Sequence, residues 1–517
     1  GIRSLEFSPE FGFKLNGKKI FLQGNANHHD LGALGATCYD KAIERMMLQL
    51  KSFGYNCIRC SHNPYSDSFA RIADRVGILV VDELTDKWSD NDYWGGRQPF
   101  THIWHKLITE WIKRDRNRPS IILWSLGNEL QIREGWAGFE GTNDWGITTY
   151  NIFNQLVKRW DHTRLTTVAM FPARAGAITR HDKEFNDYLV PPELACATEV
   201  ASFNYQSDKY DAYLKYRPDL ILFQSEAETS NLLQPYYNMD KERMVGIAYW
   251  GSVEYWGESN KWPKKGWNYS FFEHTMRPYP QAYLIKTAFM PEIPEVHIGV
   301  VDAAGAESVS WNDVIVGRMA LNECWNHTPG SRRSLFTFTN AHSVELLVNG
   351  QSMGIQKNDT TRANLRNMIY WKDVPYGNGG SVVAIARDKS GKEVARHRIE
   401  TAGKAVALRI EAETPTDWKA DGMDLQYINV TVIDKKGRPV WDYNEPLTLQ
   451  MEGAARLVAL DNGDHYTDEL FHGITSKRMY QGRMQIILRS DQEAGNVTVK
   501  ISSAGLKGTL RLKTIKE

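Results

Sequence analysis

Apolar residues recur along the first 290 positions in two alternating patterns. Short continuous apolar runs that end in polar residues are typical of strands buried on both faces. Between these runs the apolar spacing changes to three or four residues, as at Ile43, Met46, Met47 and Leu50, and Gly54 follows as a helix stop. The alternation predicts a (β/α)8 barrel over residues 12–290. Its expected strands are 20–25, 55–61, 78–83, 121–129, 165–170, 200–205, 220–226 and 244–250.

After Pro291 the helical spacing stops. Short alternating runs, such as 343–348 and 382–386, are separated by turn signals that include Asn349-Gly350 and Asp388-Lys-Ser-Gly391. This pattern predicts two all-β sandwiches, over residues 291–402 and 403–517. Residues 1–11 are interpreted as the remnant of an upstream sandwich or as a linker.

The amino-acid composition limits the classes of molecule that the protein is expected to bind. Lysine plus arginine and aspartate plus glutamate both total 62, so no net charge draws the chain to nucleic acid or to an anionic membrane. No apolar run reaches the roughly 18 residues that a membrane span needs. The 17 tryptophans and 23 tyrosines fit either sugar-stacking surfaces or large barrel and sandwich cores. Cys57 and Cys60 form a CxxC inside an expected strand, which favours small buried apolar residues over a metal site.

Two glutamates close expected barrel strands. Glu129 ends the run Ile-Ile-Leu-Trp-Ser-Leu-Gly-Asn-Glu, and Glu226 ends Leu-Ile-Leu-Phe-Gln-Ser-Glu. The carboxyl ends of parallel barrel strands meet at one mouth, so both carboxyl groups should face the same cavity. Two such groups can cleave a glycosidic bond, one as acid/base and the other as nucleophile.

Several motifs, in order along the chain, resemble glycoside hydrolase family 2, the family of β-galactosidases and β-glucuronidases. They are Ile58-Arg-Cys-Ser-His-Asn-Pro64, Val80-Val-Asp-Glu83, Asn128-Glu129, Asn204-Tyr205, Ala248-Tyr-Trp250 and Glu254-Tyr-Trp-Gly-Glu258. Trp418-Lys-Ala-Asp-Gly422 and Asp461-Asn-Gly-Asp464 resemble segments of the immunoglobulin-like modules that follow the barrel in many bacterial members. The resemblance therefore implies a TIM barrel followed by two immunoglobulin-like sandwiches.

The resemblance also implies roles for single residues. Glu129 would be the general acid/base and Glu226 the nucleophile that forms a covalent glycosyl-enzyme. A negative Glu226 nearby should keep Glu129 protonated. Asp82 and Glu83 would only support the site, and Glu228 has the right chemistry but not the motif position. The residues expected to bind or orient substrate, each with ordinary structural roles as the alternative, are Asn128, Tyr205, His62, His29, Trp250 and Arg59.

The expected activity is that of a retaining exo-β-glycosidase, with β-galactosidase foremost. β-Glucuronidase and β-mannosidase of the same family are the alternatives, together with an inactive carbohydrate-binding protein. A β-galactosidase is preferred because the segment after Glu258 lacks the Asn-x-Lys pair of glucuronidases. The expected partner is an oligosaccharide or other glycoside, with no cofactor, no catalytic metal, no nucleic acid and no membrane span. Oligomeric state stays open.

Family members normally carry a sugar-binding domain and a further sandwich before the barrel. The expectation is that these domains, and a signal for export to the periplasm or exterior, precede Gly1.

Overall fold

The fold is described from a computed structural model. The structure describes residues 3–88, 99–130, 146–171, 190–229, 233–259, 261–302, 307–311 and 314–516. The chain divides into two compact units. Unit 1 comprises Gly1–His29, Met47–Ser252 and Ser310–Val316, and unit 2 comprises Asp30–Met46, Val253–Val309 and Gly317–Glu517.

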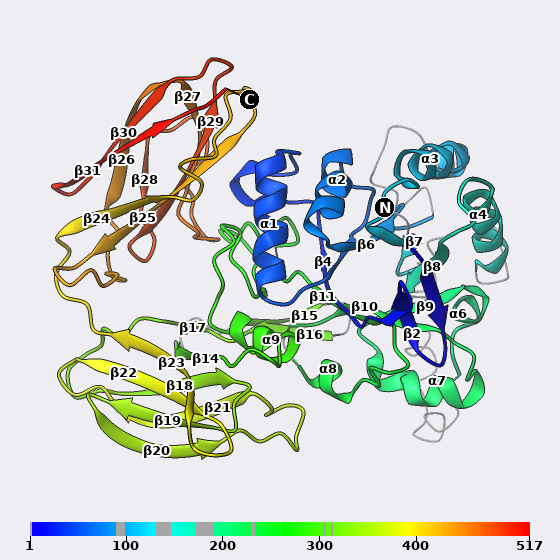
Figure 1. Cartoon of the computed structure of the whole chain (residues 1–517), viewed down its shortest axis with the longest axis horizontal. Helices are drawn as coiled ribbons and strands as arrows, with labels where there is room; N and C mark the ends of the chain where they lie inside the picture. The colour runs from blue at the N-terminus through cyan, green and yellow to red at the C-terminus, as the bar shows by residue number, and fades with distance from the viewer. Residues whose placement is uncertain are drawn as a thin grey trace. The chain divides into compact units, whose positions relative to one another are not determined.

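A closed parallel barrel of eight strands lies in unit 1, as predicted (Figure 1). Each expected strand is present, with ends that differ by at most two residues. Strand β9 pairs with β10, and β11 pairs with β4, so the ring closes in sequence order. The strands are β4 (Leu22–Asn27), β5 (Cys57–Cys60), β6 (Leu79–Glu83), β7 (Ile121–Asn128), β8 (Leu165–Met170), β9 (Val200–Asn204), β10 (Leu222–Ala227) and β11 (Gly246–Trp250).

The bodies of the barrel strands are apolar and buried, whereas polar side chains lie at their carboxyl ends. Every residue of β7 is buried, including Trp124 and Asn128. Cys57 and Cys60 are also buried free cysteines on β5, as the sequence predicts. In the closed barrel both edges of every strand are paired. The polar side chains at the carboxyl ends of the strands therefore lie at the mouth of the ring.

Helices connect the barrel strands. Helix α2 begins after Ser66, whose hydroxyl accepts a hydrogen bond from the Phe69 amide, and ends at Gly77, which has the left-handed φ of 78°. Both signals can be seen in the sequence. The helices are α1 (Asp40–Ser52), α2 (Asp67–Val76), α3 (Phe100–Asp115), α4 (Ile147–Trp160), α6 (Glu193–Ala197), α7 (Tyr210–Tyr216), α8 (Gln234–Asn238) and α9 (Ala282–Phe289). The described 3-10 turns are η1 (Gly32–Leu34) and η3 (Ser207–Lys209).

A small antiparallel sheet precedes the barrel strands. It is formed by β1 (Leu5–Ser8), β2 (Gly12–Leu15) and β3 (Lys18–Lys19). Residues 5–8, interpreted from the sequence as a remnant or linker, thus pair with the start of the barrel segment.

Unit 2 contains two antiparallel sandwiches, the green-to-yellow one of β14–β23 and the yellow-to-red one of β24–β31 in Figure 1. The expected boundary at residues 402–403 falls between β23 and β24. The first sandwich consists of β14 (Val296–Val301), β17 (Leu321–Asn322), β18 (Arg332–Thr339), β19 (Ser343–Val348), β20 (Gln351–Lys357), β21 (Met368–Pro375), β22 (Ser381–Arg387) and β23 (Glu393–Glu400). The second consists of β24 (Ala407–Ala412), β25 (Leu425–Ile433), β26 (Pro446–Gly453), β27 (Ala455–Asp461), β28 (Ser476–Arg478), β29 (Arg483–Ser490), β30 (Asn496–Ser503) and β31 (Leu506–Lys513).

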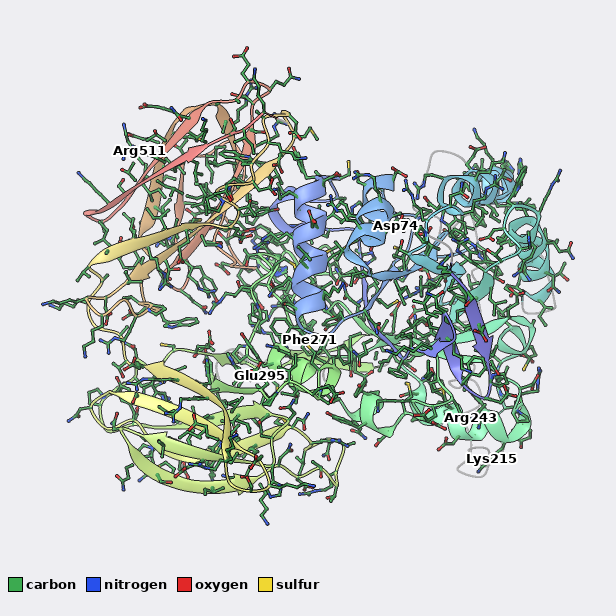
Figure 2. All side chains as sticks on the ribbon, in the orientation of Figure 1. Asp74, Lys215, Arg243, Phe271, Glu295 and Arg511 are labelled. Atoms are coloured by element: carbon green, nitrogen blue, oxygen red, sulfur yellow. The ribbon has the colours of Figure 1, made fainter. Side chains whose placement is uncertain are left out.

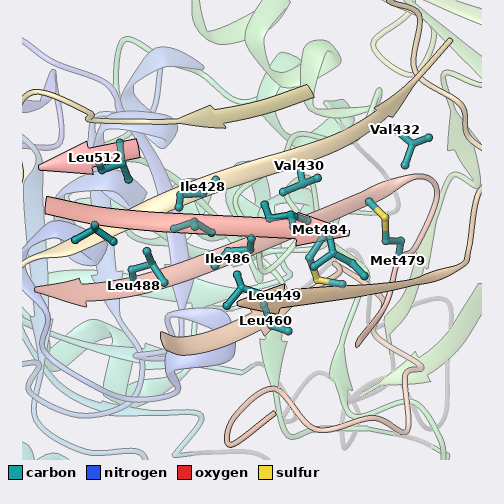
Figure 3. Close-up of a cluster of buried hydrophobic side chains, with 14 of the residues drawn as sticks. Ile428, Val430, Val432, Leu449, Leu460, Met479, Met484, Ile486, Leu488 and Leu512 are labelled. Carbon is teal, nitrogen blue, oxygen red and sulfur yellow. The ribbon is translucent and has the colours of Figure 1, made fainter. Parts of the chain in front are cut away.

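Each sandwich has its own apolar core. Trp325, Trp371 and Val344 lie in the first, and Trp418 lies in the second. Figure 3 shows the second core, where Ile428, Val430, Ile486 and Leu488 project between the sheets. Buried residues alternate with more exposed ones along β30, as the sequence pattern predicts, whereas β29 is buried at five consecutive positions.

Two short ribbons complete the described strands. One pairs β12 (Tyr255–Trp256) with β13 (Gly266–Trp267), and the other pairs β15 (Glu307–Trp311) with β16 (Val314–Arg318). In Figure 2, Lys215 and Arg511 mark exposed side chains, whereas Phe271 is fully buried. No helix among the described residues is long and apolar enough to cross a bilayer.

Candidate active site

Arg59 lies at the centre of the polar side chains within the barrel. This fully buried residue of β5 donates hydrogen bonds to Glu83, Glu226 and Asn128. The distances are 2.7 Å to Glu83 Oε2, 2.7 Å to Glu226 Oε1 and 2.8 Å to Asn128 Oδ1. The partners belong to β6, β10 and β7, so one guanidinium links four strands. These four residues are called the Arg59 network below.

Glu83 is the permanent counter-ion of this network. Burial opposes its ionisation, but Arg59, His62 and a hydrogen bond from Ser125 outweigh burial and lower the pKa of Glu83. Ser125 Oγ donates to Glu83 Oε2 at 2.7 Å. A buried carboxylate with this many donors stays ionised, which also fixes the position of Arg59.

Glu226 receives hydrogen bonds on both carboxylate oxygens. Arg59 donates to Oε1, and the Tyr205 hydroxyl donates to Oε2 at 2.7 Å. Tyr205 directly follows β9 and has a left-handed φ of 61°. At this φ the chain leaves the extended conformation of the strand, so the Tyr205 side chain does not continue the alternation that ends at Asn204. The contacts expected of Arg59 and Tyr205 with Glu226 are therefore present.

Glu129 lies in a different electrostatic environment from Glu226. It directly follows β7, is 5% exposed, and has a left-handed φ of 50°. Burial, followed by the negative charge of Glu226, raises the pKa of Glu129 to about 8; Lys87 and a hydrogen bond from Asn204 partly offset both effects. Asn204 Nδ2 donates to Glu129 Oε1 at 3.2 Å. A pKa of about 8 favours the protonated form of Glu129 at neutral pH.

The amide of Asn128 is held by four neighbours. Its Oδ1 accepts from Arg59 and, at 3.0 Å, from Asn204 Nδ2. Its Nδ2 donates to Asp86 Oδ1 at 3.1 Å and to His62 Nε2 at 3.2 Å. These contacts fix the orientation of the amide group, because the acceptor faces only donors and the donor faces only acceptors.

His62 joins the Arg59 network to an aromatic wall. Its Nδ1 lies 2.6 Å from Glu83 Oε1, so the neutral ring carries its proton there and Nε2 accepts from Asn128. The ring stacks on Trp250 with centroids 5.3 Å apart and planes at 6°. His28 meets both rings edge-on, at 5.5 Å from His62 and 5.1 Å from Trp250.

His29 lies apart from this aromatic wall. Its ring stacks on Tyr65 at 4.6 Å and approaches Phe69 of α2 at 6.5 Å. The structure therefore places His28, rather than the expected His29, beside His62 and Trp250.

Asp82 and Glu228 also separate from the two central glutamates. Asp82 Oδ2 accepts from Trp111 of α3 at 2.6 Å, on the opposite side of β6 from Glu83. Glu228 lines a cavity of about 360 Å³ that also contacts Tyr205 and Gln224.

Sequence reasoning missed Asp86 and Lys87, which follow β6. Lys87 is 6% exposed, and its Nζ lies 2.6 Å from Asp86 Oδ1. Asp86 contacts Asn128, and Lys87 lowers the pKa of Glu129. Their position just beyond a barrel strand is the sequence signal that indicates them.

The geometry brings together one protonated and one hydrogen-bonded carboxyl group. Glu129 can give a proton at neutral pH, while Glu226 presents a carboxylate oriented by Arg59 and Tyr205. This division is the one that acid-assisted substitution at a sugar carbon requires.

Comparison with known sequences gives matches over most of the chain. The profile described as glycosyl hydrolases family 2, TIM barrel domain, matches residues 10–243. The glycoside hydrolase family 2 C-terminal domain 5 matches residues 408–510, and a domain of unknown function matches residues 330–395.

Two curated relatives cover nearly all of this chain. A putative beta-glucuronidase of Formosa agariphila is 44% identical over 100% of this chain and 50% of that protein. Beta-galactosidase BoGH2A of Bacteroides ovatus is 27% identical over 98% of this chain and 63% of that protein. The chain thus spans between half and two thirds of the length of these relatives.

A solved structure agrees with both fold and family. A glycosyl hydrolase family 2 member from Bacteroides cellulosilyticus superposes with a TM-score of 0.87 at 28% identity, over 100% of this chain and 65% of that one. With its barrel, its trailing sandwiches and two matching family profiles, the chain belongs to glycoside hydrolase family 2.

Proposed function

We propose that the protein is a retaining exo-β-glycosidase in which Glu226 is the nucleophile and Glu129 the general acid/base. The contrasting environments of the two carboxyl groups carry this proposal. Both are buried, but Glu226 accepts from Arg59 and Tyr205, whereas the raised pKa of Glu129 favours its protonated form. Glu129 protonates the leaving oxygen while Glu226 attacks the anomeric carbon, which yields a covalent glycosyl-enzyme.

The second step reverses the role of Glu129. Glycosylation removes the negative charge of Glu226, which is the second-largest cause of the raised pKa of Glu129. The pKa of Glu129 then falls, and its carboxylate accepts a proton from the attacking water. Configuration at the anomeric carbon is retained because it is inverted twice.

Asn128 is proposed to bind the sugar hydroxyl next to the anomeric carbon. Both of its N–H groups are engaged with Asp86 and His62, so the hydroxyl replaces one of these contacts when substrate binds. Trp250, backed by the stacked His62 ring, supplies the apolar surface beneath the sugar.

A terminal β-galactoside is the proposed substrate. The relative from Bacteroides ovatus named a beta-galactosidase supports it, as does the missing Asn-x-Lys pair after Glu258. A β-glucuronide is the second candidate, because Lys87 offers a buried ammonium group near Glu129 and the relative from Formosa agariphila is named a putative beta-glucuronidase.

Hydrolysis of aryl β-galactoside, β-glucuronide and β-mannoside, with the anomer of the product followed by NMR, tests the proposal. Faster release of the β-anomer from the galactoside is expected. Initial release of the α-anomer contradicts retention. A preference for the glucuronide that is lost in Lys87→Met would favour the β-glucuronidase. Absence of turnover with every glycoside would favour the inactive carbohydrate-binding protein.

A further inference from the structure

A second buried cluster of titratable side chains lies in unit 2. Glu254, His274 and His465 are 1%, 4% and 4% exposed, and one ligand atom from each lies within 4.8 Å of the others. Glu254 precedes β12, His274 follows β13, and His465 follows β27. The cluster therefore joins segments almost 200 residues apart in sequence.

The ring of His465 is buried without a hydrogen-bond partner among the described residues. Neither of its ring nitrogens makes a hydrogen bond to any described residue, although both are buried. Nδ1 instead points towards Glu254 Oε2 at 3.3 Å. A buried imidazole without a hydrogen-bond partner is costly, and a bound cation would supply the missing interaction.

The spacing of the donors matches a tetrahedral ion. Zinc binds imidazole nitrogen and carboxylate oxygen at about 2.0–2.2 Å, so two ligands at a tetrahedral angle lie about 3.3 Å apart. Glu254 Oε2 lies 3.0 Å from His274 Nδ1 and 3.3 Å from His465 Nδ1. Both distances are close to the separation expected of two ligands on one tetrahedral ion.

The outer contacts leave the required atoms available. His274 Nε2 lies 2.9 Å from Asp461 Oδ1, so Asp461 can hold the proton on Nε2. His274 Nδ1 is hydrogen-bonded to Glu254 Oε2 at 3.0 Å, and an ion would replace the proton of this contact. Tyr279 donates its hydroxyl to Glu254 Oε1 at 2.6 Å, opposite the shared oxygen. A carboxylate behind a ligating histidine is the usual support of a zinc site.

Charge and access are also compatible with a divalent ion. Glu254 and Asp461 together balance two positive charges when both imidazoles are neutral. The positive charges of Lys264 and Arg318 oppose the ion. Arg318 Nη1 is 4.0 Å from Oε1, the oxygen turned towards Tyr279. His465 and Tyr279 also line a polar cavity of about 120 Å³, which gives a path for the ion and room for water as a fourth ligand.

A second group of the same residue types, His297, Glu323 and His397, lies in the first sandwich. The rings of His297 and His397 stack on each other at 4.0 Å, and His397 Nδ1 already accepts from the Ile298 amide. Its Nε2 lies 3.8 Å from Glu323. His297 Nε2 lies 3.0 Å from the same oxygen, Glu323 Oε1, so this group differs from the first in the stacking of its rings and in the Nδ1 contact of His397, and it serves as an internal comparison.

We propose that Glu254, His274 and His465 bind one divalent transition-metal ion of the zinc type. Two nitrogens and one oxygen suit zinc or cobalt, whereas calcium and magnesium prefer oxygen alone. The ion would tie the segment from Glu254 to α9 to the loop after β27. This role is structural and independent of the proposed glycosidase activity.

Metal titration of the tag-free full chain tests the site. After removal of bound metal by a chelator, Co²⁺ is expected to bind at one equivalent with the visible spectrum of a tetrahedral N₂O₂ site. Zn²⁺ should displace it and raise the thermal midpoint, because the ion binds only the folded state. Absence of saturable binding by the folded wild-type chain overturns the proposal, as does a spectrum showing thiolate ligands.

Variants locate the ion. His465→Gln should weaken binding at least tenfold, and Asp461→Asn should weaken it by about 10–100-fold through His274. The matched control is His472→Gln, an exposed histidine of the same sandwich, which should bind like wild type. Unchanged affinity in a folded His465→Gln variant contradicts the site. If that variant does not fold, X-ray absorption of the cobalt-loaded wild type must show two imidazole ligands, and fewer reject the proposal.

Discussion

At the scale of single residues, the site depends on the difference between Glu129 and Glu226. Both are buried glutamates at barrel strand ends, yet Glu226 faces Arg59 and Tyr205 while Glu129 faces Asn204. Neighbouring side chains, rather than residue type, therefore separate their chemistry.

Removal of either carboxyl group should give a distinct kinetic result. Glu226→Ala eliminates the covalent step, so we expect turnover to fall at least about 10⁴-fold. Glu129→Ala should lose about 10²–10⁴-fold on poor leaving groups but retain activity on activated aryl glycosides. Added azide should yield the β-glycosyl azide from Glu129→Ala and the α-azide from Glu226→Ala.

Glu228→Gln is the control for both variants, since this nearby carboxyl group should be dispensable for chemistry. The reverse pattern of azide anomers would exchange the two assignments.

The pH profile should report the protonation of Glu129. An acid catalyst works only while protonated, so kcat/KM should fall as pH rises through about 8. Lys87 lowers the pKa of Glu129 and Asp86 raises it. Lys87→Met removes the first effect and leaves Asp86 unbalanced, which should move the alkaline limb to higher pH.

Lys215→Met makes the same substitution at an exposed site on α7 and should leave the limb in place. An unmoved limb in Lys87→Met would mean that another group sets it.

Sequence alone indicated Glu129, Glu226 and Asn128 but did not single out His28, which lies beside His62 and Trp250. Glu129, Glu226 and Asn128 terminate recognisable apolar runs, so their convergence follows from barrel geometry. His28 could not be distinguished from His29, because β4 extends to Asn27, two residues past its expected end. Successive residues point in opposite directions, and an uncertain strand end leaves the direction of both rings undetermined.

At the scale of elements, the close approach of β11 and β4 completes the ring. Gly246 faces Leu22 across this pair. A Cβ at Gly246 would lie 2.4 Å from both the Cβ and the carbonyl oxygen of Leu22, so neither strand has room to yield locally.

Gly246→Ala should therefore destabilise the barrel. Overpacking of this kind costs about 1–3 kcal/mol, and the backbone clash places the change at the upper end or beyond. Chemical denaturation measures the loss. Gly403→Ala is the matched control, because its Cβ would meet neighbours only at 3.4 Å or more. Equal stability of the two variants would show that β11 and β4 separate readily.

The eight barrel strands could be predicted because each is a local apolar run, and the sandwiches because their turns contain glycine and asparagine. The Glu254, His274 and His465 cluster could not, since its three residues have no common local spacing. Contacts between distant segments need the fold itself.

At the scale of the whole molecule, the second sandwich has a core separate from the active-site residues. Ile486 is fully buried in that core (Figure 3), whereas unit 1 holds the Arg59 network. Chains of this size often unfold in more than one step.

Ile486→Ala should lower the stability of the second sandwich by about 2–5 kcal/mol. At temperatures below the unfolding transition of the second sandwich, glycosidase activity should persist, because the Ile486→Ala substitution does not change the Arg59 network. Calorimetry combined with residual activity on heating measures both. Leu470→Ala is the control, since that side chain is 68% exposed. If activity disappears together with the Ile486→Ala transition at every temperature, the two units unfold as one.

The arrangement around Arg59 also bears on how such a site can change over generations. One cation serves Glu83, Glu226 and Asn128, so the loss of any member leaves buried charge or polarity unmatched in the others. Single substitutions within this set are costly, and their effects combine non-additively. Changes in sugar specificity are therefore expected at residues outside the Arg59 network, such as Lys87. The four residues of the network are expected to stay the same among related proteins.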